Sequence, residues 1–156
     1  MKITIVNIAN KMPAWVNSGC DEYLQRINHG KYSCKLVELK ADKNSHKLVL
    51  AKMEAEAKKF SAAIAKDSFV IALDEDGTSY SSPQFAEFLQ ASAMHQPQIS
   101  FIIGGADGIH PQLLASANAR ISLSSLVFPH GLVRVILLEQ LYRAISILEK
   151  HPYHRE

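Results

Sequence analysis

Three carboxylates, those of Asp74, Glu75 and Asp76, directly follow the apolar run of residues 69–73. Hard divalent cations prefer carboxylate oxygens, so this cluster has the chemistry of a metal site. Carboxylates that are adjacent on one loop seldom converge on an ion without ligands from elsewhere, and a solvated turn accounts for the same residues. We therefore predict a turn over residues 74–78 and no resident metal.

Glycines follow a second apolar run, that of residues 99–103, at positions Gly104, Gly105 and Gly108. Glycine lets a ligand approach the backbone closely, and a strand, glycines and then a helix form the layout of a phosphate cradle. A dinucleotide site needs G-x-G-x-x-G after the first strand, whereas the pattern here is G-G-x-x-G and comes late. A ligand loop and a tight turn without a ligand both remain open.

The third segment that could bind a ligand is the apolar stretch 123–128, which contains Ser124 and Ser125. It is followed by Pro129, His130 and Gly131. Small hydroxyls among apolar side chains can enclose an adenine ring while backbone groups meet its polar edge. A strand that runs into a helix explains the same pattern. The segment is therefore a candidate nucleotide loop on its composition alone.

The apolar pattern predicts strands that alternate with helices along the chain. Five strands are predicted, over residues 2–8, 34–39, 69–73, 99–103 and 119–123. Helices are predicted over residues 12–28, 46–64, 111–118 and 131–149, and another opens with Ser82 as N-cap and Pro83 in its first position. This alternation is typical of an α/β fold with a mostly parallel sheet flanked by helices on both faces. Ligands of such sheets bind beyond the carboxyl ends of the strands, where the three segments begin.

Length and composition indicate one globular domain over residues 1–156. Hydrophobic residues make up 47% and charged residues 21%, which excludes a disordered or fibrous chain. Cys20 and Cys34 lack the spacing of a zinc or disulfide motif, so two free thiols are predicted. The first apolar run is too short for a signal peptide, and no segment approaches the roughly 18 apolar residues of a membrane helix. We therefore expect a cytoplasmic protein that contacts no membrane.

The net charge of +2 conceals an asymmetry between the two halves of the chain. Residues 1–66 carry 12 Lys+Arg against 6 Asp+Glu, and residues 67–156 carry 5 against 9. Eleven of the twelve N-terminal cations are lysines, which suit loose contact with a phosphate backbone. A solvated helical face is the alternative interpretation of this charge.

Taken in order, these segments resemble one family, the SPOUT (α/β-knot) methyltransferases that methylate N3 of a pseudouridine in large-subunit ribosomal RNA. The likeness covers essentially the whole chain and begins at residues 1–3, 11–15 and 22–24. Its most specific motifs are residues 103–108, 122–126, 129–134, 139–144 and the terminal hexapeptide 151–156. The sequence departs from the family at Gly131, where proline is usual, and at Ala106 and Asp107, where a Pro-Glu pair is usual. Neither departure removes an expected binding group.

The resemblance implies a trefoil knot near the C-terminus, a homodimer with a pocket completed across its interface, and S-adenosylmethionine as cofactor. The knot would gather the three loops into one pocket. The cofactor contacts implied are Leu73, Gly104, Gly105, Leu123, Ser124, Ser125, Leu126, Val127 and Phe128. The substrate would be a pseudouridine of folded ribosomal RNA in the assembled ribosome, because so small a chain has little surface with which to select one nucleotide.

Methyl transfer to N3 needs a group that accepts the imide proton. The resemblance brings the C-terminal tail to the pocket, which makes Tyr153, His154, Arg155 and Glu156 candidates beside His130. Tyr153 can stack on a base and the Arg155 guanidinium can hold a phosphate, as can that of Arg134. The sequence does not distinguish which group takes the proton or which subunit supplies the tail.

Three other functions remain possible on the residues alone. One is a non-catalytic basic module that binds RNA during ribosome assembly. Another is a metal-dependent nuclease or hydrolase using Asp74, Asp76 and either His130 or His154. A nucleotide-dependent dehydrogenase is the weakest alternative, because the glycine fingerprint is incomplete.

Overall fold

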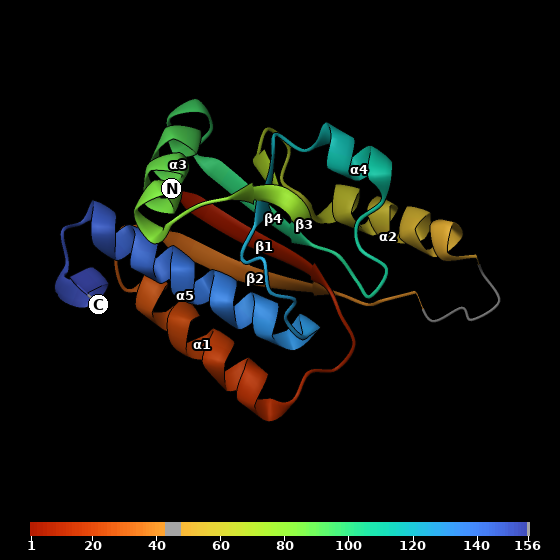
Figure 1. Cartoon of the computed structure of the whole chain (residues 1–156), viewed down its shortest axis with the longest axis horizontal. Helices are drawn as coiled ribbons and strands as arrows, with labels where there is room; N and C mark the ends of the chain where they lie inside the picture. The colour runs from red at the N-terminus through yellow and green to blue at the C-terminus, as the bar shows by residue number, and fades with distance from the viewer. Residues whose placement is uncertain (43–47, 156) are drawn as a thin grey trace.

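A computed structural model describes residues 1–42 and 48–155. Its centre is a five-stranded sheet in which every pairing is parallel and the strand order is β2-β1-β4-β3-β5 (Figure 1). The strands are β1 (Lys2–Ile8), β2 (Ser33–Leu39), β3 (Phe69–Ser79), β4 (Gln98–Ile103) and β5 (Ala119–Ser122). The predicted α/β class with a parallel sheet is confirmed.

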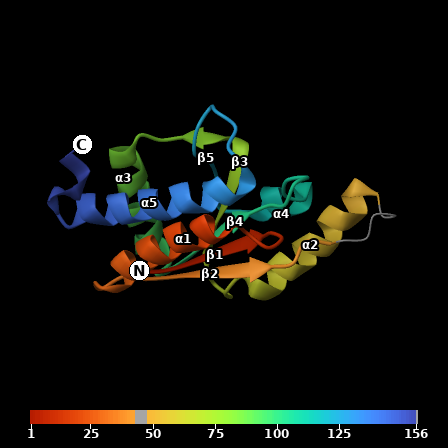
Figure 2. The same cartoon turned by 90° about the horizontal axis from the view of Figure 1, so that it is seen from below.

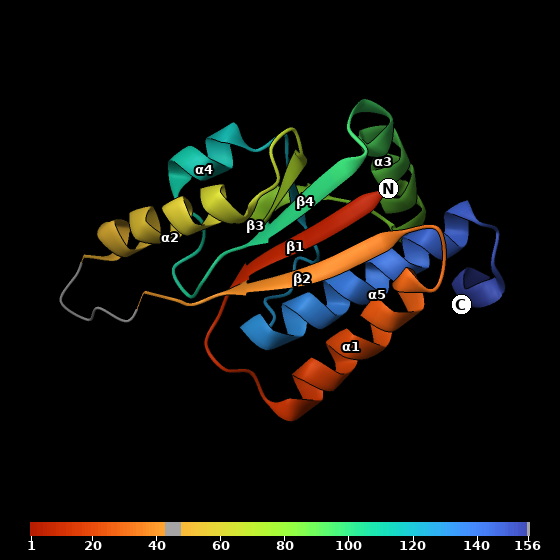
Figure 3. The same cartoon turned by 180° about the vertical axis from the view of Figure 1, so that it is seen from behind.

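Helices cover both faces of the sheet, because parallel strands need crossover connections. The first face packs against α1 (Ala14–Asn28), α3 (Ser82–His95) and α5 (His130–Leu148), and Figure 2 shows α1 and α5 together on one side of β1 and β2. The other face packs against α2 (Val49–Ala63) and α4 (Pro111–Ser116), which Figure 3 shows from behind. A single 3-10 turn, η1 (Pro152–Arg155), ends the described chain.

Alternate side chains of each strand enter different cores, which follows from the two-residue period of a strand. Ile3 and Ile5 of β1 pack with the core under α1, α3 and α5. Val6 and Ile8 pack instead with Phe60 of α2. Residues of β1 are almost wholly buried on both faces, so the near-continuous apolar run at residues 3–8 suits a central parallel strand.

Three local predictions need correction. The third long helix is capped by Ser81 rather than Ser82: the Gln84 N–H donates to Ser81 Oγ, and the Gln84 side chain accepts from the Ser81 N–H, which together form a capping box. Pro13 stands before α1 as its N-cap instead of inside it. For the predicted helix 46–64, the described part is Val49–Ala63, and positions 46 and 47 lie outside the described residues.

The largest correction concerns residues 74–78, where a turn was predicted and β3 continues to Ser79. The pairing of β3 with β5 shifts register between Leu73 and Thr78, so the strand bulges and then resumes beside Ile121. A Cβ on Gly77 would lie 2.5 Å from the Ile121 carbonyl carbon, which means that only glycine fits this approach. Turn-forming residue types predicted a chain reversal, but a bulge uses the same residues.

Both cysteines are free, as predicted, and both are buried. Burial raises the pKa of the Cys20 thiol to about 11 and that of the Cys34 thiol to about 12. With a pKa of about 11, only roughly one Cys20 thiol in a thousand is ionised at pH 8. The thiolate is the reactive form, so Cys20 reacts slowly in the folded protein.

We expect both thiols of the native protein to resist iodoacetamide at pH 8 and to react completely in concentrated urea. Burial both blocks the reagent and raises the thiol pKa, and unfolding removes the two effects together. Mass spectrometry of timed samples measures the reaction. Native labelling as fast as that of the unfolded chain contradicts the burial of these residues.

Candidate functional site

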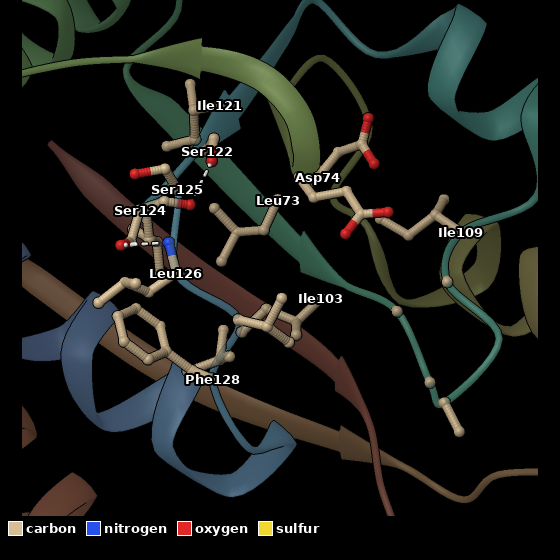
Figure 4. A pocket seen from close by; sticks show the side chains of 18 of the residues that line it. Leu73, Asp74, Ile103, Ile109, Ile121, Ser122, Ser124, Ser125, Leu126 and Phe128 are labelled. Atoms are coloured by element: carbon tan, nitrogen blue, oxygen red, sulfur yellow. Dashed lines mark hydrogen bonds between the residues drawn. The ribbon is translucent and has the colours of Figure 1, made fainter.

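One cavity of about 480 Å³ lies at the carboxyl ends of β3, β4 and β5 (Figure 4). The sheet register brings the strands together there, because Leu73 pairs with Ile103 on one side and with Ile121 on the other. Figure 4 shows side chains from all three strand ends and from the loop after β5 around a common space. All nine residues that the resemblance assigned to a cofactor line this cavity. Its volume is typical of small-molecule sites.

The wall after β4 is a tight glycine turn. Gly108 has a φ of +84° and its N–H donates to the Gly105 carbonyl at 3.0 Å. A Cβ on Gly104 would lie 2.6 Å from the Gly108 carbonyl carbon and 2.8 Å from Ile109 Cγ1. The turn therefore brings backbone, not side chains, to the cavity, as a loop that admits a ligand closely must do.

In the wall after β5, serine hydroxyls form hydrogen bonds within the loop, and apolar side chains are exposed. Ser122 Oγ donates to the Ser124 carbonyl at 3.0 Å, and the Leu126 N–H donates to Ser124 Oγ at 2.9 Å. Leu126 and Val127 are 72% and 88% exposed. An apolar pair this exposed at the rim of a cavity indicates that a ligand or another chain covers it.

The acidic segment of β3 supplies a carboxylate that is already paired. Asp74 and Glu75 line the cavity, and Arg120 Nε donates to Asp74 Oδ2 at 2.9 Å. The same hydrogen bond raises the pKa of the Arg120 guanidinium. Within residues 1–42 and 48–155, no group of three or more His, Cys, Asp or Glu side chains is arranged to hold a metal ion.

A buried carboxyl, that of Glu56 on α2, supports the glycine turn from behind. Its oxygens lie where a Gly105 side chain would be, 3.3 and 3.4 Å from an ideal Cβ, and Oε1 accepts from the Asp42 N–H at 3.4 Å. Desolvation raises the pKa of Glu56, and the nearby Asp107 carboxylate raises it further. Glu56 stands among the lysines of an amphipathic helix with no motif around it, so the sequence alone does not mark it as part of the site.

Four apolar residues also line the cavity without having been predicted as site residues: Ile103, Ile109, Ile121 and Val133. Ile103 ends β4 and Ile121 lies in β5, whereas Ile109 follows the glycine turn and Val133 lies in the first turn of α5. An apolar residue at such positions is equally typical of the core, so the sequence does not single these residues out.

His130 and Arg134 fasten α5 to the sheet. His130 Nε2 lies 2.7 Å from the Ile8 carbonyl oxygen, so the ring N–H donates to the end of β1. Arg134 is completely buried, and its Nη1 lies 3.2 Å from Glu38 Oε1. A guanidinium closed off from solvent does not suit the RNA contact that the resemblance implied for Arg134.

The C-terminal turn η1 packs against the far end of α5, and Figure 1 shows that end opposite the start of the helix. Tyr153 Oη donates to Glu139 Oε1 at 3.2 Å, and the Tyr153 ring makes an edge contact with Tyr142 at 4.7 Å between centroids. Burial, followed by a hydrogen bond with Tyr23 and the Glu139 charge, raises the pKa of Tyr153. The phenol therefore keeps its proton at neutral pH.

Within one chain the tail does not approach the cavity. The 19 residues of α5 span about 28 Å at 1.5 Å per residue, and the tail and cavity stand at its opposite ends. His154 has a buried Nδ1 with no hydrogen-bond partner among the described residues, whereas Arg155 is exposed. Glu156 lies outside the described residues.

Comparisons with known proteins agree with this geometry. A family model described as "Predicted SPOUT methyltransferase" matches residues 1–154. The chain is 43% identical to a protein of Methylobacillus flagellatus over an alignment of 157 residues that covers 100% of both chains, and that relative is named ribosomal RNA large subunit methyltransferase H. Proteins of the same name from Burkholderia ambifaria and Burkholderia thailandensis are each 42% identical over 99% of both chains. Among the described residues, no helix is long and apolar enough to cross a bilayer.

The tight glycine turn generates a stability prediction. Gly104→Ala places a methyl group within 3 Å of the Gly108 backbone, so the turn must move, and we expect the free energy of unfolding to fall by about 1–3 kcal/mol. Urea denaturation measures this change. Gly30→Ala is the matched control, because the nearest atom to its Cβ is 4.0 Å away, and it should alter stability by less than about 0.5 kcal/mol. Equal effects of the two substitutions would show that the close approach does not constrain the turn.

Proposed function

The chain belongs to the SPOUT methyltransferase family, and we propose that it uses S-adenosylmethionine to methylate N3 of a pseudouridine in large-subunit ribosomal RNA. The observation that carries the proposal is the convergence of three segments on one cavity, namely residues 73–75 of β3 and the loops after β4 and β5. The names of its full-length relatives support ribosomal RNA as the substrate.

The lining of the cavity fits the proposed cofactor. Residues 123–128 combine apolar side chains with backbone groups and would enclose the adenine, while Gly104 and Gly105 would admit the cofactor close to the backbone. The exposed Leu126 and Val127 provide apolar surface that a bound adenosine would cover. When bound, S-adenosylmethionine supplies an electrophilic methyl group on its sulfonium.

The protein must then bring the substrate nitrogen to about 3–3.5 Å from that methyl carbon and accept the N3 proton. His154 is the tail residue best suited to accept it, since its Nδ1 has no hydrogen-bond partner among the described residues. Tyr153 holds its proton and suits a stacking or donating role. The exposed Arg155 suits a phosphate of the RNA.

A homodimer is part of the proposal, because one chain keeps its tail and its cavity at opposite ends of α5. In the dimer, the tail of one protomer completes the cavity of the other. The exposed side chains of Leu126 and Val127 beside the cavity, and of Trp15 at the start of α1, offer apolar surface for a second chain.

Three further features belong to the same proposal. The trefoil knot near the C-terminus and a cytoplasmic location are supported by family membership. A single methyltransferase domain over residues 1–156 is supported by the extent of the family match. Recognition within the assembled ribosome is supported by the size of the chain, and the lysine-rich first half supplies charge that a phosphate backbone would attract.

Calorimetric titration with S-adenosylmethionine tests the cofactor. We expect micromolar to submillimolar affinity for the wild-type protein, and methyl transfer from the labelled cofactor to ribosomes that lack the modification. Activity should survive a chelator, because the methyl group is already activated by the sulfonium.

An affinity for S-adenosylmethionine weaker than millimolar would contradict the proposal. RNA binding without cofactor binding would indicate a non-catalytic RNA-binding module instead. Methylation of a short free hairpin as fast as that of the assembled particle would contradict recognition within the ribosome.

Deletion of residues 151–156 tests the tail. We expect methyl transfer to vanish and cofactor affinity to stay within a few-fold, because the tail lies far from the cavity of its own chain. Loss of cofactor binding along with activity would show that the tail is structural.

A mixed dimer tests which protomer supplies the tail. One chain lacks residues 151–156 and the other carries Ser125→Trp, which fills the cavity. Activity returns if the intact tail of the second chain serves the intact cavity of the first. If each tail serves its own cavity, the mixed dimer stays inactive.

A further inference from the structure

A second group of interacting polar side chains lies next to the cavity without lining it. Asn7 of β1 and Arg134 of α5 are both completely buried, on the face of the sheet that α1 and α5 cover. The Glu38 carboxylate of β2, which is 48% exposed, forms an ion pair with Arg134. We call Asn7, Glu38 and Arg134 the polar cluster. A buried charge is costly, and an ion pair does not by itself recover that cost against well-packed apolar residues.

The contacts within the polar cluster are specific. With its side-chain oxygen turned toward the guanidinium, Asn7 accepts from Arg134 Nη2 and, at 3.2 Å, from Arg134 Nε. Arg134 Nη1 lies 3.2 Å from Glu38 Oε1 as an ion pair, without a hydrogen bond to any of the described residues. A guanidinium is a planar fork, so hydrogen bonds to one strand together with an ion pair to its neighbour define the orientation of α5.

The polar cluster adjoins two walls of the cavity. On one side, Asn7 pairs in register with Ile103, the last residue of β4 before the glycine turn. On the other, Arg134 follows Val133, which lines the cavity, on the helix that begins directly after the 123–128 loop. The polar cluster thus joins the strand that ends in one wall to the helix that begins at the other.

We propose that Arg134 and Asn7 are positioning residues for the cofactor: they hold the start of α5 at a defined distance from β1 and β4, so that the two walls stand ready for the ligand. This inference rests on the proposed function. It explains why a charge is buried where apolar side chains would pack as well, because apolar contacts leave a helix freer to slide and rotate than a directional fork does.

The test replaces both buried partners with apolar side chains of similar size, in Asn7→Leu/Arg134→Met. Replacing both leaves no buried polar group unpaired, so thermal stability should change little. We expect the dissociation constant for S-adenosylmethionine to rise at least tenfold. The cofactor KM should rise correspondingly, while kcat at saturating cofactor stays within a few-fold.

Leu89→Ala on α3 is the matched control. Leu89 is completely buried in the same core but lies on a helix that does not line the cavity, so its truncation should lower stability and leave cofactor affinity unchanged. Hydrogen exchange gives a second readout without the cofactor. Amides of residues 124–130 should exchange faster in the double variant than in Leu89→Ala.

Glu38→Gln is the milder variant should the double variant not fold, because the Glu38 side chain is half-exposed and its substitution leaves the core intact. We expect it to weaken cofactor binding about threefold. Unchanged affinity in Asn7→Leu/Arg134→Met, or in Glu38→Gln where only that variant folds, overturns the inference. So does an affinity loss that Leu89→Ala reproduces. A wild-type protein that does not bind S-adenosylmethionine overturns the proposed function, and this inference with it.

Discussion

Parallel pairing of β3 with both β4 and β5 is the constraint on which the cavity depends. Parallel strands all end at the same edge, and the register places Leu73 level with Ile103 and Ile121. Three segments that are separated by some 20 to 50 residues in the sequence, namely the bulge of β3 and the ends of β4 and β5, therefore meet at one point of the sheet. The glycine turn after β4 and the serine-containing loop after β5 become opposite walls because of this register alone.

Helix α5 connects the cavity at its first turn with the C-terminal residues at its last turn. Its first turn is held to β1 by the hydrogen bond between His130 and the Ile8 carbonyl, next to the cavity. Its last turn holds the C-terminal residues through the contacts of Tyr153 with Glu139 and Tyr142. A rigid rod of about 28 Å separates the two groups of residues, so chemistry that needs both requires a second chain.

Polar groups are buried around the cavity although the two cores are otherwise apolar. Glu56 stands behind the glycine turn, and the polar cluster of Asn7, Glu38 and Arg134 lies beside β4. Each is directional where apolar packing is not, and each touches the base of a cavity wall. This distribution suits a site in which one wall, the glycine turn, is backbone, because side-chain contacts behind a loop are then the means of setting its position.

The sequence by itself determined the elements and the class of fold. Apolar periodicity is a local property, so the helices, four of the five strands and the loops after β4 and β5 were found to within a few residues, whereas β3 continues six residues beyond its predicted end. It also determined which residues line the cavity after β5 and β4, through motifs carried by one family. Free thiols at Cys20 and Cys34 followed from spacing alone.

Only the tertiary structure decided how the polar residues are used. Asp74, Glu75 and Asp76 have the composition of a turn, but pairing with β5 makes them part of a bulged strand. Arginine is a residue type that suits contact with RNA, but the position of Arg134 on α5 directs its side chain into the protein, toward Asn7 and Glu38. The physical reason is the same in both cases. Packing between segments that are distant in the chain decides which group a charged side chain or a strand edge pairs with, and the local sequence pattern does not contain this information.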